Sequence, residues 1–227
     1  MSDGPNIARI AALIGEPARA EILTALMSGQ SLTATELAER AGVTKQTAST
    51  HLAKLREARL LAMDRQGRRS YFRLADRDVA QLLESLMGVA YRAGALTLRA
   101  GPRELALRKA RVCYDHLAGE LGVQTFDGLE RRRHLRRAGD VLELTATGRR
   151  FFHDFGLDVD MLGQQRRPLC RSCLDWSMRR SHLAGALGAA LLDRCLELRW
   201  ARRSGSSRTV DFSVPGERAF RKQFEWV

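Results

Sequence analysis

Four kinds of segment or motif are missing from this 227-residue sequence. It has no run of eighteen apolar residues, so we expect no membrane-spanning helix. The first eleven residues lack a basic start followed by an apolar stretch, so they do not resemble a secretory signal. Glycine-rich nucleotide loops and a Gly-x-Ser-x-Gly nucleophile motif are also missing, which argues against the common enzymes that use them. We therefore expect a cytoplasmic protein that is not an enzyme.

Acidic residues and lysine are both scarce relative to arginine. Lys+Arg total 38 against 26 Asp+Glu, which gives a formal net charge of +12, and only four of the 38 are lysines. This surplus favours a polyanionic partner, nucleic acid before membrane. The chain also has only 4 cysteines, Cys113, Cys170, Cys173 and Cys195. In a reducing cytoplasm these are expected to be thiols or metal ligands rather than structural disulfides.

The predicted fold class is mainly α with small β-hairpins (α+β). Gly101-Pro102 interrupts a long helical pattern, so we divide the chain into domains 1–100 and 101–227. Spacing and capping residues predict a series of short helices, then a hairpin and a last helix, in the first domain. The expected helices are Asn6–Ile14, Pro17–Met27, Thr33–Glu39, Thr44–Glu57 and Asp78–Leu98, and the expected strands are Leu60–Met63 and Ser70–Leu74.

The third and fourth of these helices, with a glycine turn between them, indicate a helix-turn-helix. Its second helix begins at Thr44 with small, polar, mostly uncharged residues, which suit the major groove. Gln46 can make a bidentate contact to adenine, and threonine methyl groups can touch thymine. The hairpin tip supplies arginines for phosphate or the minor groove. The expected DNA-binding residues are Thr44, Lys45, Gln46, Thr47, Ser49, Thr50, His51, Lys54, Arg65, Arg68 and Arg69.

This segment resembles the ArsR/SmtB winged-helix repressors over roughly residues 5–98. The resemblance rests on Val43–Leu55, Leu60-Leu61 and the run Gly67–Leu74. It implies a homodimer built on the first and last helices, an operator in double-stranded DNA with dyad symmetry, and release by an inducer. Both of the family's usual metal sites are missing here, because 36–40 contain no cysteine and 77–100 contain no histidine.

The second domain contains an internal repeat. His116–Gly122 recurs as His182–Gly188, and the segment around Leu142–Phe152 resembles Val210–Phe220. We predict two copies, at about 105–160 and 171–227, each formed by two helices and a hairpin in a winged-helix-like unit.

Two short motifs hold three of the four cysteines: Cys113-x-x-His116 and Cys170-x-x-Cys173. They could form a site for zinc or another thiophilic metal, or a reactive thiol sensor. They could equally be packing residues, since an expected helix from Arg103 to Leu121 puts Cys113 and His116 one turn apart, and the repeat aligns Cys113 with Arg179. Neighbouring arginines should lower the pKa of Cys170, and Cys195 should lie in the core.

Two further features of the second domain have open interpretations. Arg131–Arg133, Arg136 and Arg137 are expected on a helix ending at Gly139, as a second DNA contact or as a solvated basic face. Asp175 is expected to cap a helix that begins near Leu174. The sequence as a whole predicts a sequence-specific dimeric DNA-binding regulator, most simply a repressor. The alternatives are a thiol-active C-x-x-C enzyme and a structural protein that binds nucleic acid without sequence preference.

Overall fold

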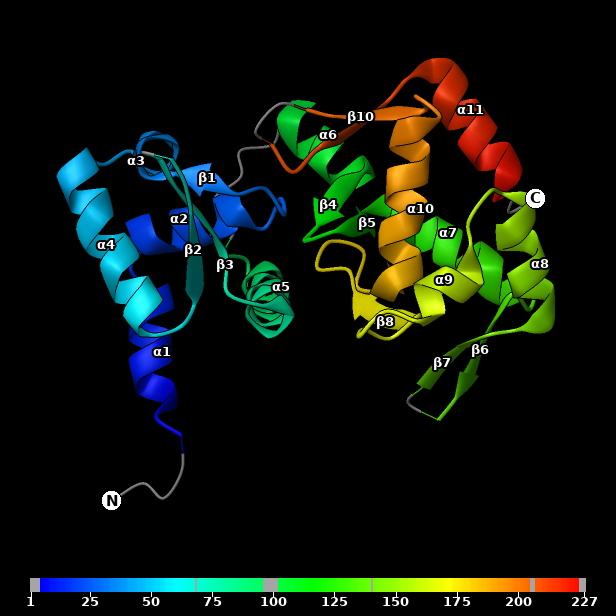
Figure 1. Cartoon of the computed structure of the whole chain (residues 1–227), viewed down its shortest axis with the longest axis horizontal. Helices are drawn as coiled ribbons and strands as arrows, with labels where there is room; N and C mark the ends of the chain where they lie inside the picture. Colours follow the sequence, from blue (N-terminus) through cyan, green and yellow to red (C-terminus); the bar gives the residue numbers. More distant parts are fainter. Residues whose placement is uncertain (1–4, 68, 96–101, 140, 205–206, 225–227) are drawn as a thin grey trace. The chain divides into compact units, whose positions relative to one another are not determined.

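The computed structural model describes residues 5–67, 69–95, 102–139, 141–204 and 207–224 (Figure 1). The chain divides into an N-terminal unit, Met1–Leu83, and a C-terminal unit, Glu84–Val227. This boundary lies inside helix α5 (Arg77–Arg92) rather than at Gly101-Pro102, of which Gly101 lies outside the described residues. The second half of α5 belongs to the C-terminal unit because its side chains pack there: the Tyr91 and Trp176 ring centroids are 5.7 Å apart.

The N-terminal unit has the predicted order of helices and a hairpin. Thr33 and Glu36 form the expected reciprocal capping box at the start of α3, and the Thr44 hydroxyl accepts from the Thr47 N–H at the start of α4. Gly42 ends α3 in the left-handed conformation, with φ of 65°. The elements are α1 (Ile7–Ile14), α2 (Pro17–Leu26), β1 (Leu32–Thr33), α3 (Ala34–Ala41), α4 (Lys45–Glu57), β2 (Leu61–Gln66), β3 (Arg69–Leu74) and the first turns of α5.

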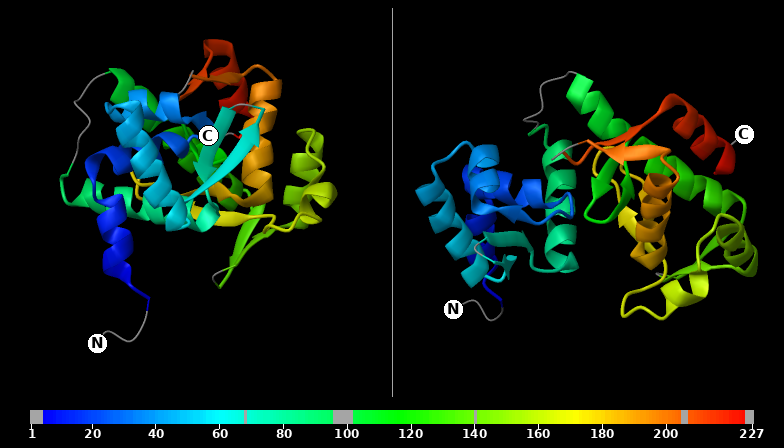
Figure 2. Two further views of the ribbon diagram at one scale, coloured as in Figure 1. Left: turned by 60° about the vertical axis from the view of Figure 1, so that its left-hand side comes forward. Right: turned by 45° about the horizontal axis from the view of Figure 1, so that its top comes forward.

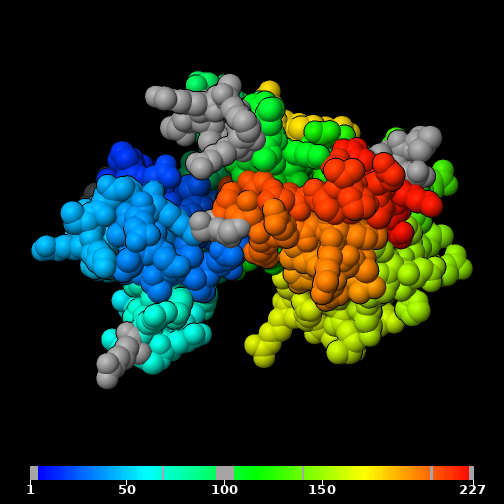
Figure 3. All heavy atoms as spheres, turned by 90° about the horizontal axis from the view of Figure 1, so that it is seen from above, coloured from blue at the N-terminus to red at the C-terminus, as the bar shows by residue number. Residues whose placement is uncertain are grey.

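The β2–β3 hairpin, here called the wing, belongs to a three-stranded antiparallel sheet in the order β1-β3-β2. Strand β1 was not predicted, because two residues are too few to show an alternating pattern; Leu32 pairs with Phe72. The base of the hairpin is anchored by buried Leu61 and Leu74, whereas its tip is exposed. Figure 3 shows this hairpin (cyan) standing out from the helices of the same unit.

The C-terminal unit contains the predicted repeat, but its elements differ from those expected. Each copy is hairpin–helix–hairpin–helix, instead of two helices followed by a hairpin. After α6 (Pro102–Lys109), the first copy comprises β4 (Arg111–Cys113), β5 (His116–Ala118), α7 (Glu120–Arg131), β6 (Leu135–Ala138), β7 (Val141–Leu144) and α8 (Ala146–Asp154). After α9 (Val159–Gly163), the second comprises β8 (Arg171–Leu174), β9 (Ser181–Ala184), α10 (Gly185–Glu197), β10 (Ala201–Arg203), β11 (Val210–Phe212) and α11 (Val214–Gln223).

The expected helix from Arg103 to Leu121 was wrong. Helix α6 ends at Lys109, and Tyr114 has a φ of 63°, which a continuing helix cannot contain. Strands β4 and β5 are three residues each and buried throughout, so they show neither the alternation of a half-buried strand nor a reliable helical period.

One apolar core joins the two copies, and equivalent positions of the repeat supply it. Figures 1 and 2 show helix α10 (orange) running through this unit, where it contacts β5 of the other copy, while α7 contacts β9. The buried residues at equivalent positions are Leu117 and Leu183, Leu121 and Leu187, Phe126 and Leu192, Leu129 and Cys195, and Phe152 and Phe220. Cys195 is fully buried, as predicted.

Two other expectations for this unit need correction. Asp175 caps a turn rather than a helix: its Oδ1 accepts from the N–H groups of Ser177 and Met178. The arginine run does not lie on one helix, because α7 ends at Arg131 and β6 begins at Leu135. Within the described residues, no helix is both long and apolar enough to cross a membrane.

Candidate nucleic-acid interface and metal centre

The exposed face of α4 carries the residues predicted to read DNA. Ala48, Leu52 and Leu55 are buried and hold the helix on the body of the unit. The opposite side is exposed to solvent, so its polar groups could contact the major groove of DNA without any movement of the helix. We call the following exposed residues the α4 face: Thr44, Lys45, Gln46, Thr47, Ser49, Thr50 and Lys54.

Local hydrogen bonds fix much of this face. The hydroxyls of Ser49 and Thr50 donate to the carbonyls of Lys45 and Gln46, at 2.9 and 3.2 Å. Among the residues that the structure describes, none forms a side-chain hydrogen bond with the Gln46 amide, which therefore stays available to a base edge. The α4 face can thus offer one flexible amide among hydroxyls that already have partners.

His51 differs from the other predicted DNA contacts. Its side chain is only 14% exposed, and its Nδ1 lies 3.7 Å from Glu16 Oε2 and 3.4 Å from Arg19 Nη1, at the start of α2. It therefore packs between α4 and α2 instead of pointing to solvent. On the wing, Arg65 and Arg69 are exposed as predicted, and Arg68 lies outside the described residues.

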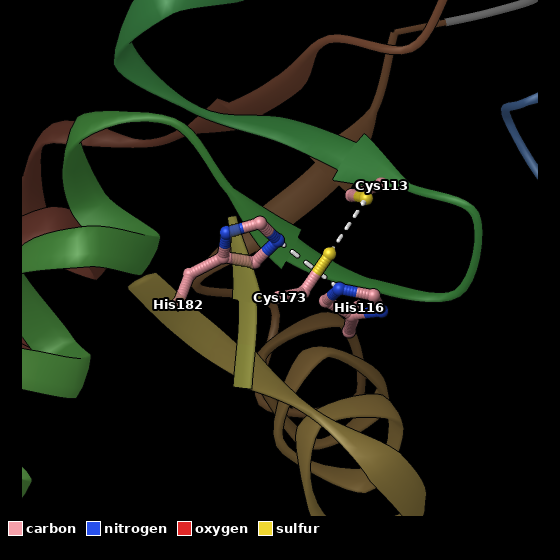
Figure 4. A group of neighbouring side chains, drawn as sticks. All are labelled: Cys113, His116, Cys173 and His182. Atoms are coloured by element: carbon pink, nitrogen blue, oxygen red, sulfur yellow. Dashed lines mark hydrogen bonds between the residues drawn. The ribbon is translucent and has the colours of Figure 1, made fainter. Parts of the chain in front are cut away.

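Four side chains of the C-terminal unit converge in the second candidate site (Figure 4). They are Cys113, His116, Cys173 and His182, here called the Cys/His group, and their ligand atoms all lie within 4.8 Å of one another. The two Sγ atoms are 3.9 Å apart and the two Nε2 atoms 3.1 Å apart. Three of the four residues are buried, and Cys173 is half-buried.

Strand register explains which residues meet. Cys113 pairs with His116 across β4–β5, and Cys173 pairs with His182 across β8–β9. Cys170 is absent from the group: it precedes β8, which begins at Arg171. It packs in the apolar core instead. The structure therefore brings together three of the four predicted sensor residues, and His182 takes the place given to Cys170.

The expected low pKa of Cys170 is also wrong. Burial raises the pKa of this thiol to about 12, against a smaller lowering by the Arg149 charge. The nearby Arg167 guanidinium is directed elsewhere, to Asp115 Oδ2 at 2.8 Å. A buried, protonated thiol of this kind is a poor nucleophile.

Within the Cys/His group, the surroundings raise the pKa values of Cys113 and His116 and lower that of His182. Contact with the Cys173 thiol, together with burial, raises the pKa of Cys113 well above its usual range. Burial lowers the pKa of His116, but the Cys113 sulfur and the Asp115 carboxylate outweigh it and raise the value to about 9. Burial and the neighbouring His116 lower the pKa of His182 well below its usual range.

A sequence signal for this group exists, and our repeat alignment missed it. Arg111-x-Cys113-x-Asp115 corresponds to Arg171-x-Cys173-x-Asp175, sixty residues later, and the strand registers of the two hairpins match. The second hairpin has a longer loop, so the offset then becomes 66 at the histidines. An alignment at one constant offset placed Cys113 opposite Arg179 and hid the equivalence of the two cysteines.

Known proteins are similar to the N-terminal region or to nearly the whole chain. The model of a helix-turn-helix domain matches residues 14–64. YdfF of Bacillus subtilis, an uncharacterized HTH-type transcriptional regulator, is 42% identical over 218 residues, 96% of each chain. The HTH-type transcriptional regulator CmtR of Mycobacterium tuberculosis is 34% identical over 83 residues, which cover 37% of this chain and 70% of CmtR.

Solved structures cover the same N-terminal region. The NMR structure of the cadmium sensor CmtR from Mycobacterium tuberculosis is 28% identical, with a TM-score of 0.32, and covers 42% of this chain and 95% of that one. The homodimeric winged helix-turn-helix domain of Mb0332 from Mycobacterium bovis is 25% identical, with a TM-score of 0.35, and covers 44% and 99%. Both alignments include less than half of this chain.

Proposed function

The chain belongs to the HTH-type transcriptional regulators, and on that premise we propose that the α4 face and the wing read an operator in double-stranded DNA. The observation that carries the proposal is the exposed α4 face, held by buried Leu52 and Leu55 and flanked by the exposed wing arginines Arg65 and Arg69. Direct readout comes from Gln46 and the threonine methyl groups, and phosphate contacts come from the arginines.

The second part of the proposal is a homodimer on an operator with dyad symmetry. Helix α1 has no buried residue, and Ile7 is 79% exposed. On α5, Leu82, Leu86 and Val89 are 40%, 41% and 51% exposed, and their spacing puts them along one stripe. A second copy of the chain is the occupant that buries both apolar helices, in agreement with the dimer that the ArsR/SmtB resemblance implies.

The third part concerns regulation and location. We place the protein in the cytoplasm and assign it as a repressor, with an inducer that acts on the C-terminal unit.

A thiol-active C-x-x-C enzyme is disfavoured because Cys170 is buried and its pKa is raised. A structural protein without sequence preference is disfavoured because uncharged groups form most of the exposed α4 face. For the second arginine cluster we favour the interpretation as a solvated basic face, because Arg136 and Arg137 form ion pairs with Glu143 and Glu130.

The test compares specific and non-specific DNA. Fluorescence anisotropy measures the Kd for a labelled duplex from the region upstream of the protein's own gene and for a scrambled duplex of equal composition. Gln46→Ala should weaken binding to the first by about 1–3 kcal/mol, roughly 5–150-fold, and leave the second nearly unchanged. Gln165→Ala is the matched control, because Gln165 is exposed in the C-terminal unit.

Two results would contradict this assignment. Equal losses on both duplexes would show that Gln46 does not read bases. Equal affinity of the unaltered protein for both duplexes, in the presence and absence of competitor DNA, would support binding without sequence preference.

A further inference from the structure

We propose that the Cys/His group is a tetrahedral binding site for a thiophilic divalent ion of the Zn²⁺ type, and that occupancy of this site changes the affinity of the protein for DNA. The binding site stands on the geometry of the C-terminal unit alone. Its effect on DNA rests on the function proposed above.

The donor set is the first argument. Two sulfurs and two imidazole nitrogens are the ligands of closed zinc sites, and hard ions such as Mg²⁺ and Ca²⁺ prefer oxygen. With metal–ligand distances of about 2.3 Å for sulfur and 2.05 Å for nitrogen, a tetrahedron separates two sulfurs by about 3.8 Å and two nitrogens by about 3.3 Å. The observed separations are 3.9 Å between the Sγ atoms and 3.1 Å between the Nε2 atoms. These two separations match a tetrahedral site, and all four ligand atoms lie within 4.8 Å of one another.

The surroundings of His116 are the second argument. Its Nδ1 lies 2.9 Å from Asp115 Oδ1, while the other carboxylate oxygen of Asp115 accepts from Arg167 at 2.8 Å. In the neutral imidazole, a carboxylate on Nδ1 favours the tautomer in which that atom carries the proton, which leaves the Nε2 lone pair available for a metal ion. Such an outer contact is what orients ligating histidines in metal sites.

His182 supplies a third, independent argument. Its side chain is fully buried, and its Nδ1 has no hydrogen-bond partner among the described residues. Its Nε2 lies 3.1 Å from the Nε2 of His116, a hydrogen-bond distance, so one proton between the two atoms satisfies both in the metal-free protein. Burying an imidazole with so few partners is costly for packing alone. A cation bound by both Nε2 atoms would take the place of that proton.

The hairpin that carries Cys113 is tied to α5. The Arg208 backbone carbonyl accepts from the Val112 N–H at 2.7 Å, and the Arg208 side chain returns a hydrogen bond from Nε to the Val112 carbonyl at 3.0 Å. The same guanidinium forms an ion pair with Glu84 and contacts the Met87 sulfur at 3.4 Å, both on α5. Glu84 and Arg208 are nearly fully buried.

This connection gives the ion a route to the DNA-reading unit. Helix α5 begins at Arg77, within the N-terminal unit, and continues as one helix past Glu84. An ion that fixes β4 against β9 also fixes the anchor of Arg208 on α5. A ligand shifts DNA affinity only if it favours one arrangement of the protein over the other, and α5 is the element through which such a preference passes.

The binding test uses the full chain, stripped of metal with a chelator under reducing conditions and titrated with Co²⁺. We expect one Co²⁺ per chain, the visible absorption of tetrahedral cobalt with thiolate charge transfer, and displacement of cobalt by Zn²⁺. Four matched Cys→Ala variants locate the site. Cys113→Ala and Cys173→Ala should weaken binding at least a hundredfold, whereas Cys170→Ala and Cys195→Ala should retain it.

Histidine variants distinguish the Cys/His group from the set that the sequence motifs suggested, namely Cys113, His116, Cys170 and Cys173. His182→Ala should lose the tetrahedral spectrum, and His153→Ala is the control because the His153 side chain is 83% exposed. Tryptophan fluorescence and circular dichroism of each metal-free variant report whether it folds; Cys173→Ala decides the question if the more buried Cys113→Ala does not fold. No cobalt binding by the folded wild type overturns the site. Loss in Cys170→Ala with retention in His182→Ala also overturns it.

The DNA arm measures the Kd for the upstream duplex with and without one equivalent of Zn²⁺. A change of at least about fivefold in the wild type, absent in Cys173→Ala, supports coupling. Stoichiometric metal binding with an unchanged Kd overturns the coupling and leaves the site standing. Metal binding by a protein that fails to bind the upstream duplex in either state overturns the proposed function instead, so the two failures are distinguishable.

Discussion

The α4 face and the Cys/His group differ in almost every physical respect. The α4 face is a single run of residues on one helix, exposed and held from behind by Leu52 and Leu55. The Cys/His group is formed by four strands from two copies of a repeat, and three of its four side chains are buried. A DNA-binding surface must remain accessible to solvent until the DNA binds. The ligands of a closed metal site, in contrast, must be shielded from water and held in place before the ion binds.

The comparison also shows how the two copies depend on each other. A Cβ added at Gly122 would lie 3.7 Å from the His182 Cβ, and one added at Gly188 would lie 3.4 Å from the His116 Cβ. Each histidine therefore lies against the helix of the other copy. Neither copy alone could form the Cys/His group, whereas α4 needs only its own unit.

The largest effect should come from the buried ion pair beside the Cys/His group. Arg111 Nη2 and Asp175 Oδ2 are 2.8 Å apart, and both side chains are fully buried. Asp175→Ala leaves the guanidinium without its counter-charge and should lower the free energy of unfolding of the C-terminal unit by about 3–5 kcal/mol. Urea unfolding followed by tryptophan fluorescence measures this, because every tryptophan in the sequence lies in that unit.

The matched control is Asp160→Ala. Asp160 pairs with Arg149 at 3.0 Å, but its side chain is 91% exposed, so a change of only about 0–1 kcal/mol is expected. A similar loss in both variants would show that burial does not distinguish the two pairs.

The same pair predicts a pH dependence. Burial raises the pKa of Asp175, but the Arg111 charge and the backbone N–H groups of Met178 and Gly119 outweigh it and hold the value below its usual range. Because the folded-state pKa is depressed, the stabilisation is present above the unfolded pKa of about 3.9 and is lost as pH falls through the folded value. Fluorescence-detected unfolding at pH 3–6 should show a smaller pH slope in Asp175→Asn than in the wild type. Equal slopes would assign the acid sensitivity to other carboxyls.

The next effect concerns the apolar stripe of α5. Leu86 is 41% exposed, so Leu86→Glu should leave the fold of the chain intact. At a dimer interface the same change buries a carboxylate and should cost of the order of 3 kcal/mol, roughly a hundredfold in dimer affinity. Light scattering and sedimentation at micromolar concentration should detect monomers that bind the upstream duplex weakly.

The control for this variant is Gln81→Glu, which adds the same charge at an exposed position of α5 outside the apolar stripe. This variant should remain a dimer, because Gln81 and Leu86 are five residues apart and point about 140° apart around the helix. A stable Leu86→Glu dimer would place the interface elsewhere.

Zinc should raise the stability of the C-terminal unit selectively. Zn²⁺ held free at about a hundred times its Kd should stabilise the C-terminal unit by about 2.7 kcal/mol, in the fluorescence-detected transition. The wild type should show the shift and Cys173→Ala should not. Because the thiols must lose their protons to bind zinc as thiolates, zinc affinity should rise as pH increases from about 6 to about 8. Affinity that is independent of pH would argue against thiolate ligands.

The smallest effect should come from the wing. Arg69→Ala should weaken binding to specific and scrambled duplexes alike and reduce the slope of log K against log salt by about one unit. Arg202→Ala is the matched control, since its side chain is 84% exposed in the C-terminal unit. A slope that changes equally in both variants would show that overall charge, rather than the wing, sets the salt dependence.

The accuracy of the sequence-based expectations also differed between the units. In the N-terminal unit, the capping box at Thr33, the cap at Thr44 and the glycine turn at Gly42 were all confirmed. These signals act within a few residues, so the sequence shows them directly. His51 was expected to face DNA and instead packs near Glu16, because the start of α2 lies close to α4 only after folding.

In the C-terminal unit the repeat was visible but its architecture was not. The equivalent positions of Leu117 and Leu183, or Phe152 and Phe220, are all in the core, in agreement with the internal similarity. A helix was predicted in place of the first short strands, since three residues carry no usable period and only pairing across the hairpin stabilises them. The motif Cys170-x-x-Cys173 was interpreted as a possible pair of metal ligands because its spacing is typical of zinc sites.

The amino-acid sequence alone determined the helix-turn-helix, the basic wing and the existence of two related halves in the second domain, because capping, turn chemistry and charge are local properties. The tertiary structure decided which cysteines meet. Cys170 packs in the core before β8 begins, and the strand register places Cys173 beside His182. Only the packing of one copy against the other brings that pair to Cys113 and His116. Contacts between residues more than fifty positions apart depend on how the copies dock, and no local pattern in the sequence specifies that docking.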